Sequence, residues 1–193
     1  AYEANDAKKV VAIVMDPSNA QIKAMCNYPE ADLNNLPRND TELLTDLSRN
    51  TAALDAYEPG STFKIITTAS ALESGAATLE STYNCSGYAV VNGEKIKCWR
   101  SGNPHGTQSL TQAVENSCNP CFVHMALDMG KSTFYDYIYK FGFGKKTGAD
   151  FSSEGAGIVT DSKYVTDNDL ARIGFGQSIA VTPLQLINSV CTV

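Results

Sequence analysis

The hydrophobic and polar positions along the chain predict a strand pair near its start. Residues 9–15 are apolar and β-branched, which favours a buried strand, and residues 21–26 alternate as a returning strand would. Asp16-Pro17-Ser18-Asn19 between them supplies turn residues, so we expect a β-hairpin. Farther along, Asn92-Gly93 between two short strand-like runs predicts a second hairpin.

From residue 34 onward, apolar positions at helical spacing predict a mostly helical chain. The leucines near residue 44 indicate a first helix within 34–50, and a helix after Pro59-Gly60 should end at Gly75. Capping residues and prolines predict five more helices. These run from Ser109 toward Asn116, from an Asn119 cap ahead of Pro120 to Gly130, from a Ser132 cap through Phe141, over 166–173 and over 182–190. The fold class is therefore α+β, with the strand pair packed against a large helical subdomain.

Composition limits the class of protein. The chain has 193 residues, enough for one domain with a core, and 43% of them are hydrophobic. The net charge is −6, so a basic face for nucleic acid is not expected. No apolar run approaches the roughly 20 residues that span a bilayer, and no signal-peptide pattern opens the chain. The opening residues resemble an arbitrary cut, so we expect a piece of a longer protein with an anchor upstream.

A Ser-x-x-Lys motif stands at the start of the predicted helix after Gly60. Residues three apart share a helix face, so Ser61 and Lys64 can meet. A serine hydroxyl needs an adjacent base to act as a nucleophile, and a lysine serves if burial lowers its pKa. A serine in the first turn also has its N–H near the positive end of the helix dipole, where it can stabilise an oxyanion. By itself the motif is equally typical of a serine cap followed by a solvated lysine.

Ser117-Cys118-Asn119 lies between two predicted helices, where polar side chains can reach a cleft. Ser117 could pass a proton between Lys64 and a leaving amine, and Asn119 could bind a substrate amide. The alternative is that Asn119 only caps the helix that begins at Pro120.

Taken together, the motifs resemble the penicillin-binding protein family, specifically its class B transpeptidases, over nearly the whole chain. Details at Cys98-Trp99 and Ser117 to Pro120 resemble the sporulation-specific and cell-division members of Gram-positive bacteria. The matching segments occur in the family's order. They are residues 14–17 with 22–25, 57–64, 117–119, 141–144, 147–150, 176–179 and 181–185.

The resemblance implies acyl transfer by Ser61 with Lys64 as base, Ser117 as a further catalytic residue and Asn119 as a substrate-binding residue. The substrate would be a peptidoglycan stem peptide ending in D-Ala-D-Ala, and β-lactams would acylate the same serine. The family uses no metal and no organic cofactor. Its members work at the extracytoplasmic face of the bacterial membrane, with cell-division or sporulation membrane proteins as possible partners.

The family's third motif, Lys-Thr/Ser-Gly on a strand, is expected beyond Val193. Lys146-Thr147-Gly148 spells it, but it follows a predicted helix and precedes the 176–185 segment, so we expect a turn there. Residues 1–193 would then be a partial transpeptidase domain that lacks later sheet strands. Because losing an oxyanion donor costs about 10²–10³ in rate, we expect the fragment alone to be nearly inactive.

The six cysteines leave the cellular compartment open. Cys118-Asn119-Pro120-Cys121 resembles a redox motif, but it follows a helix rather than a strand. A zinc site using Cys98, Cys118 and Cys121 with a histidine is disfavoured by the irregular spacing. A Cys98–Cys118 disulfide, tying the Ser-x-Asn turn to the second hairpin, is a sharper hypothesis. The two histidines, His105 and His124, are expected to be structural.

Two other functions compete with the transpeptidase. A serine β-lactamase or β-lactam sensor domain also uses Ser-Thr-Phe-Lys, but Ser117-x-Asn119 and the 176–185 segment favour the transpeptidase. The second is a non-catalytic scaffold. For the whole protein, the scaffold is disfavoured because all four candidate residues are intact, namely Ser61, Lys64, Ser117 and Asn119. A purely structural role for the fragment stays open.

Overall fold

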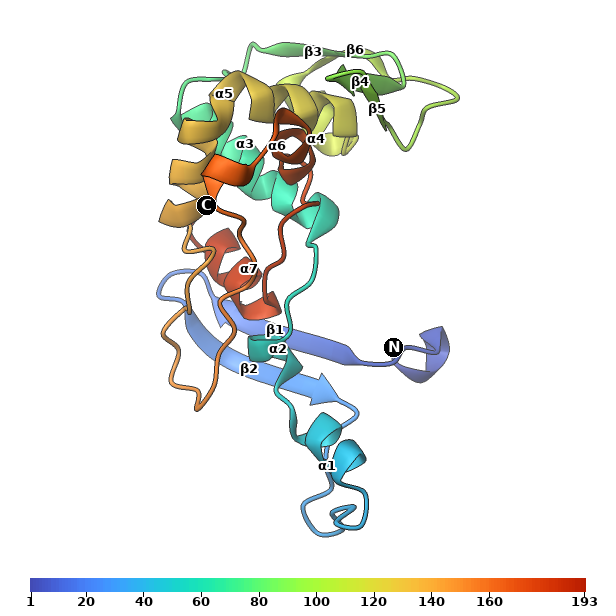
Figure 1. Cartoon of the computed structure of the whole chain (residues 1–193), viewed down its shortest axis with the longest axis vertical. Helices are drawn as coiled ribbons and strands as arrows, with labels where there is room; N and C mark the ends of the chain where they lie inside the picture. The colour runs from blue at the N-terminus through green and yellow to red at the C-terminus, as the bar shows by residue number, and fades with distance from the viewer.

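The computed structural model describes all 193 residues and places them in an elongated arrangement of short strand pairs and helices (Figure 1). The strands form three separate two-stranded antiparallel sheets. They are β1 (Val10–Asp16) with β2 (Gln21–Tyr28), β3 (Thr82–Cys85) with β6 (Gly106–Ser109), and β4 (Tyr88–Val91) with β5 (Glu94–Lys97). None of the helices is both long and apolar enough to cross a lipid bilayer.

Seven α-helices and three 3₁₀ turns complete the fold. The α-helices are α1 (Thr41–Ser48), α2 (Thr51–Leu54), α3 (Lys64–Glu73), α4 (Leu110–Glu115), α5 (Asn119–Lys140), α6 (Asp167–Ile173) and α7 (Pro183–Val190). The 3₁₀ turns are η1 (Glu3–Asn5), η2 (Gly60–Phe63) and η3 (Ser162–Tyr164). Helices α4, α6 and α7 each open with a capping box, which satisfies two backbone donors at the helix start.

The main core lies in the helical part, where α3 and α6 pack on α5. Fully buried aromatic side chains fill it, among them Phe63, Phe122, Phe134 and Phe143. Since dispersion and apolar burial scale with the area removed from water, these rings dominate the stability of this part. Helix α3 is thereby fixed as a rigid support for the residues at its N-terminal end.

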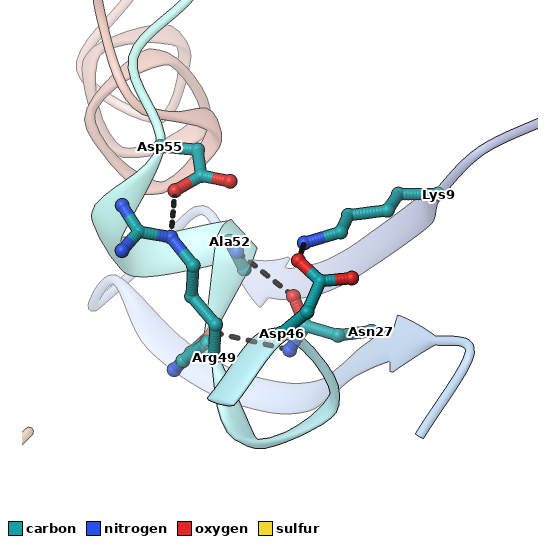
Figure 2. Close-up of polar contacts among 7 residues, drawn as sticks. Lys9, Asn27, Asp46, Arg49, Ala52 and Asp55 are labelled. Atoms are coloured by element: carbon teal, nitrogen blue, oxygen red, sulfur yellow. Dashed lines mark hydrogen bonds and ion pairs between the residues drawn. The ribbon is translucent and has the colours of Figure 1, made fainter. Parts of the chain in front are cut away.

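The β1–β2 hairpin, expected from the sequence, lies away from this core beside α2 and α7 (Figure 1). Polar contacts attach it to the segment that follows (Figure 2). The Asn27 side chain accepts a hydrogen bond from the Ala52 amide at 2.9 Å, and Lys9 pairs with Asp46 at 2.6 Å. Arg49 also pairs with Asp55. The hairpin therefore orients the chain that leads into η2.

Three details differ from the sequence prediction. Ser61 lies in the 3₁₀ turn η2, and the α-helix begins only at Lys64. Cys118, not Asn119, is the N-cap of α5, and Asn119 is the first helical residue. The break expected at Gly130 is present, with φ 71°, but no hydrogen bond from a Ser132 side chain caps the second half of α5. For Asn119, the tertiary contacts with Lys64 and Lys97 outweigh the local capping preference.

Lys146-Thr147-Gly148 does not lie on a strand, as expected, but it is irregular loop rather than the predicted turn. Lys146, Thr147 and Gly148 belong to neither helix nor strand. The Thr147 hydroxyl and the Gly148 amide both donate to the Glu154 carboxylate, at 2.7 and 3.1 Å. The loop continues to the α2 end of the molecule, where the Gly155 amide donates to the Ala53 carbonyl at 2.8 Å. These contacts give the segment a structural role within its loop.

Candidate active site

The candidate site is an open cleft of about 400 Å³ between the start of α3, strand β5 and the segment after α6. Gly60, Ser61 and Asn119 lie on its wall together with the strand β5. Ser61 is solvent-exposed, so its hydroxyl is available to a molecule in the cleft. Sequence reasoning singled out Ser61 and Asn119 but missed the wall formed by β5 and by Arg172 and Phe175.

Lys64, three residues after Ser61, is almost completely buried, with 4% of its surface exposed. Its amine donates to the Ser117 carbonyl at 2.8 Å, the Ser117 hydroxyl at 2.9 Å and the Asn119 side-chain oxygen at 2.7 Å. A protonated lysine has three N–H donors, and three acceptors surround it. The structure thus brings Lys64, Ser117 and Asn119 together, as the two motifs predicted.

The charge of Lys64 has no carboxylate partner within ion-pair distance. Burial lowers the pKa of Lys64 from 10.5 to about 8, because loss of water destabilises the charged ammonium more than the neutral amine. The Phe122 ring centroid lies 5.0 Å from the amine, within the range of a cation–π contact. A buried lysine with a lowered pKa and no counter-ion is typical of a group that exchanges protons.

No hydrogen bond joins the Ser61 hydroxyl to Lys64, whose donors are occupied by the Ser117-Cys118-Asn119 turn. Catalytic hydrogen bonds are often long in ligand-free enzymes and tighten once substrate is bound. The Ser117 hydroxyl, at 2.9 Å from the amine, is a path by which Lys64 can exchange a proton with the cleft.

Ser117 occupies a strained backbone conformation, with φ 48°. A non-glycine residue in the left-handed region costs about 1–3 kcal/mol and persists only when its surroundings fix it. Here the strain turns both the carbonyl and the hydroxyl of Ser117 toward Lys64. The Ser117 amide and the Cys118 amide remain bonded to carbonyls of α4, which holds the turn.

Asn119 does not cap α5, so the capping alternative left open by the sequence is wrong. Its side-chain oxygen accepts from Lys64, and its amide nitrogen donates to the Lys97 carbonyl of β5 at 3.4 Å. That second contact is long, so the amide can be given up to a ligand at little cost. Asn119 therefore connects the buried amine to the strand that forms the far wall of the cleft.

The turn that carries Ser61 is held by the segment following α6. The Gly60 amide donates to the Gly176 carbonyl at 2.9 Å, and Tyr57 and Val181 exchange two backbone hydrogen bonds. Glu58 accepts from the Ser178 amide at 2.8 Å. These bonds join the 57–64 and 176–185 segments, which the sequence singled out separately.

A second cluster lies behind the Ser-x-Asn turn. The sulfurs of Cys98 and Cys118 are 4.0 Å apart as free thiols, so the proximity required by the disulfide hypothesis is present without the bond. Burial raises the pKa of Cys98 to about 11 and lowers that of His105. Contact with Cys121, and then burial, raises the pKa of Cys118 as well. His124 is exposed on α5, away from this cluster.

Comparisons with known proteins show the family to which the chain belongs. The family model "Penicillin binding protein transpeptidase domain" matches residues 10–193. The chain is 39% identical over 182 residues to stage V sporulation protein D of Bacillus subtilis, covering 94% of this chain and 28% of that protein. It is 31% identical to the peptidoglycan D,D-transpeptidase FtsI of Escherichia coli, covering 98% of this chain and 31% of that protein. The chain thus spans less than a third of these relatives.

Solved structures share the fold at lower sequence identity. The transpeptidase domain of penicillin-binding protein 3 from Burkholderia pseudomallei superposes with a TM-score of 0.84 at 22% identity. The match covers 99% of this chain and 51% of that one. A structure described as a peptidoglycan glycosyltransferase from Burkholderia ambifaria gives the same score and covers 54% of its chain. Nearly all of the chain shares the α+β fold of these structures, about half of whose length it covers, and the chain belongs to the penicillin-binding protein transpeptidase family.

Proposed function

We propose that the protein is a serine-type peptidoglycan D,D-transpeptidase, with Ser61 as nucleophile and Lys64 as its base. The observation that carries the proposal is the buried Lys64 amine, which is hydrogen-bonded to Ser117 and Asn119. Lys64 follows the exposed Ser61 by three residues. A pKa of about 8 raises the neutral fraction of the amine at pH 7 roughly 300-fold over an ordinary lysine. That fraction, roughly a tenth, is available to accept a proton.

In the proposed reaction the Ser61 oxygen attacks the carbonyl carbon between two terminal D-alanines, and its proton passes to Lys64. The C–N bond then breaks, D-alanine leaves, and its nitrogen takes up a proton through the Ser117 hydroxyl. The amine of a neighbouring stem peptide attacks the acyl-enzyme, forms the cross-link and releases Ser61 with its proton restored. Asn119 binds a substrate amide, and the backbone N–H of Ser61 donates to the oxyanion.

The wider setting follows from the same proposal. A peptidoglycan substrate places the domain at the extracytoplasmic face of the bacterial membrane, anchored through sequence outside these 193 residues. β-Lactams would bind by acylating Ser61. Membrane proteins of cell division or sporulation would be its partners. Residues 1–193 alone would be nearly inactive, because the chain carries Lys-Thr-Gly only in the loop at 146–148.

Labelling with a fluorescent penicillin tests the proposal in the full-length protein. Wild type should form a stable covalent adduct on the peptide containing Ser61, and Ser61→Ala should form none. Ser153→Ala, at an exposed serine in a loop, is the matched control and should label normally. An adduct that persists in Ser61→Ala would overturn the assignment of the nucleophile. Rapid turnover of nitrocefin instead of stalled acylation would identify a β-lactamase.

A further inference from the structure

Three cysteines and one histidine converge behind the Ser-x-Asn turn, from four separate segments. We call them the thiol–imidazole cluster: Cys85, Cys98, His105 and Cys118. Their ligand atoms all lie within 4.8 Å of one another. The three cysteines are between 0% and 3% exposed, so the cluster is closed to bulk water on the sulfur side.

Strand pairing brings these residues together. Cys85 at the end of β3 is paired with Gly106 of β6, which places it beside His105. The Cys98 amide, just after β5, donates to the Gly87 carbonyl at 2.9 Å. Cys118 joins them as the N-cap of α5. Backbone structure therefore places the three cysteines, and His105 directly precedes strand β6.

The spacing within the cluster matches a tetrahedral zinc centre. With Zn–S bonds of about 2.3 Å and a Zn–N bond of about 2.0–2.1 Å, tetrahedral angles separate two sulfurs by about 3.8 Å and a sulfur from a nitrogen by about 3.5 Å. The Cys98 and Cys118 sulfurs are 4.0 Å apart, and Cys98 Sγ lies 3.5 Å from His105 Nδ1. Cys₃His is one of the usual ligand sets of structural zinc sites.

The polar atoms of the cluster have few other partners. Nε2 of His105 is buried and makes no hydrogen bond, and Nδ1 contacts only a sulfur. Buried polar groups are nearly always hydrogen-bonded, so a histidine held in this way needs an explanation. The Trp99 and His105 rings pack in an edge-to-face arrangement, with 5.5 Å between centroids, and the Trp99 indole N–H donates to the Asn116 carbonyl at 2.9 Å. The ring is thus positioned with Nδ1 beside Cys98 Sγ, where it can bind a metal, while Nε2 has no partner.

We propose that the thiol–imidazole cluster binds one Zn²⁺ ion. The three thiols would lose their protons to solvent and bind as thiolates, and the imidazole would bind as the neutral ring. Three protons are released for each zinc bound, and the centre carries a net charge of −1. The set differs from the one that the sequence weighed, because Cys85 takes the place considered for Cys121.

The position of Cys118 gives this ion a role in the active site, in a step that rests on the proposed function. Cys118 lies between Ser117 and Asn119, whose side chains both accept from Lys64. Zinc at Cys118 would fix this turn against the β4–β5 hairpin, whose strand β5 forms a wall of the cleft. The cluster residues are positioning residues, since none of them contacts the reacting atoms.

Metal content tests the site independently of activity. Full-length protein purified under reducing conditions and supplied with Zn²⁺ should retain about one equivalent per chain after gel filtration. Cys98→Ser and His105→Asn should each lower this to less than about a tenth. Cys26→Ser, at an exposed cysteine, and Cys121→Ala, at a buried cysteine outside the cluster, are the matched controls and should retain zinc. Co²⁺ in place of Zn²⁺ should give thiolate charge-transfer bands and the visible bands of tetrahedral cobalt.

Several results would overturn the site. They are a reduced wild type that holds no zinc, equal zinc in Cys98→Ser and wild type, and octahedral cobalt spectra. Mass mapping that finds a Cys98–Cys118 disulfide in protein isolated without added oxidant would also do so. Ser61→Ala should still bind zinc. Zinc binding without penicillin labelling would refute the proposed function alone, and labelling without zinc would refute the metal site alone.

Discussion

The Ser117-Cys118-Asn119 turn has two faces with different chemistry. Ser117 and Asn119 accept hydrogen bonds from the Lys64 amine, beside a cleft open to solvent. Cys118, between them, faces three other ligand-type side chains in a closed cluster. A helix start lets successive residues diverge in this way. The comparison teaches that one short motif can present different chemistry on its two faces, so the two proposals predict that each face can be altered separately.

The largest expected effect is on the cleft face, at Lys64. Lys64→Met removes the base while keeping an unbranched apolar stem, so penicillin acylation of full-length protein should slow about 10²–10⁴-fold. Lys64→Arg should not rescue it, because a guanidinium does not release its proton near neutral pH. Stopped-flow labelling measures the rate.

Lys95→Met, at another cation lining the cleft, is the control for Lys64→Met and should change the acylation rate far less. Zinc content should stay the same in all three variants. Loss of zinc from Lys64→Met would show that the two faces of the turn are coupled, which would contradict the prediction that each can be altered separately.

The next largest effect, on stability, is expected where Gly176 contacts Gly60, a residue that lines the cleft. A Cβ on Gly176 would lie 2.1 Å from the Gly60 carbonyl oxygen, and its φ of +81° disfavours a side chain. Gly176→Ala should therefore destabilise the protein by about 2–4 kcal/mol and displace the turn carrying Ser61. Gly148→Ala has the same kind of φ, +83°, but open space around it, and should cost only about 1–2 kcal/mol. Thermal unfolding of both variants measures the difference. Equal losses of stability would show that the contact with Gly60 does not add to the cost of the substitution.

A smaller effect is expected from pH. Because the neutral amine is the proposed base, the acylation rate should rise about tenfold per pH unit up to about pH 8 and then level off. The folded state binds the Lys64 proton more weakly than the unfolded chain, whose pKa is near 10.5. Stability should thus rise with pH between about 8 and 10.5 through this group. Lys64→Met should lose both dependences, and a rate that falls as pH rises toward 8 would contradict the role of Lys64.

Local signals explain why the sequence predicted most of the fold and the cleft face. The β1–β2 hairpin follows from turn residues between two apolar runs, and the helix starts at Ser109, Thr166 and Thr182 follow from capping residues a few positions apart. Ser61 and Lys64 were found in the same way, since their spacing along one turn is itself the chemical signal.

The thiol face depends on pairing between distant segments, which leaves little local trace. Strands β3 and β6 are four residues each, too short for an alternation pattern to identify. Their register nevertheless places Cys85 beside His105, so the cluster could not be assembled without the pairing. Asn119 shows the same limit. Its local sequence fits either a helix cap or a hydrogen-bond partner of Lys64, and only the tertiary contact with Lys64 distinguishes the two roles.

The smallest effect is expected at the rim of the cleft, where Arg172 of α6 pairs with Glu94 of β5. Both side chains are partly exposed, at 31% and 46%, and such pairs contribute less than about 1 kcal/mol. Arg172→Gln should therefore change the free energy of unfolding by less than that amount, and a double-mutant cycle with Glu94→Gln should show weaker coupling in high salt. Zinc content should not change, since neither residue belongs to the cluster. A coupling well above 1 kcal/mol would mean that this ion pair, rather than Cys118, fixes the β4–β5 hairpin against the active site.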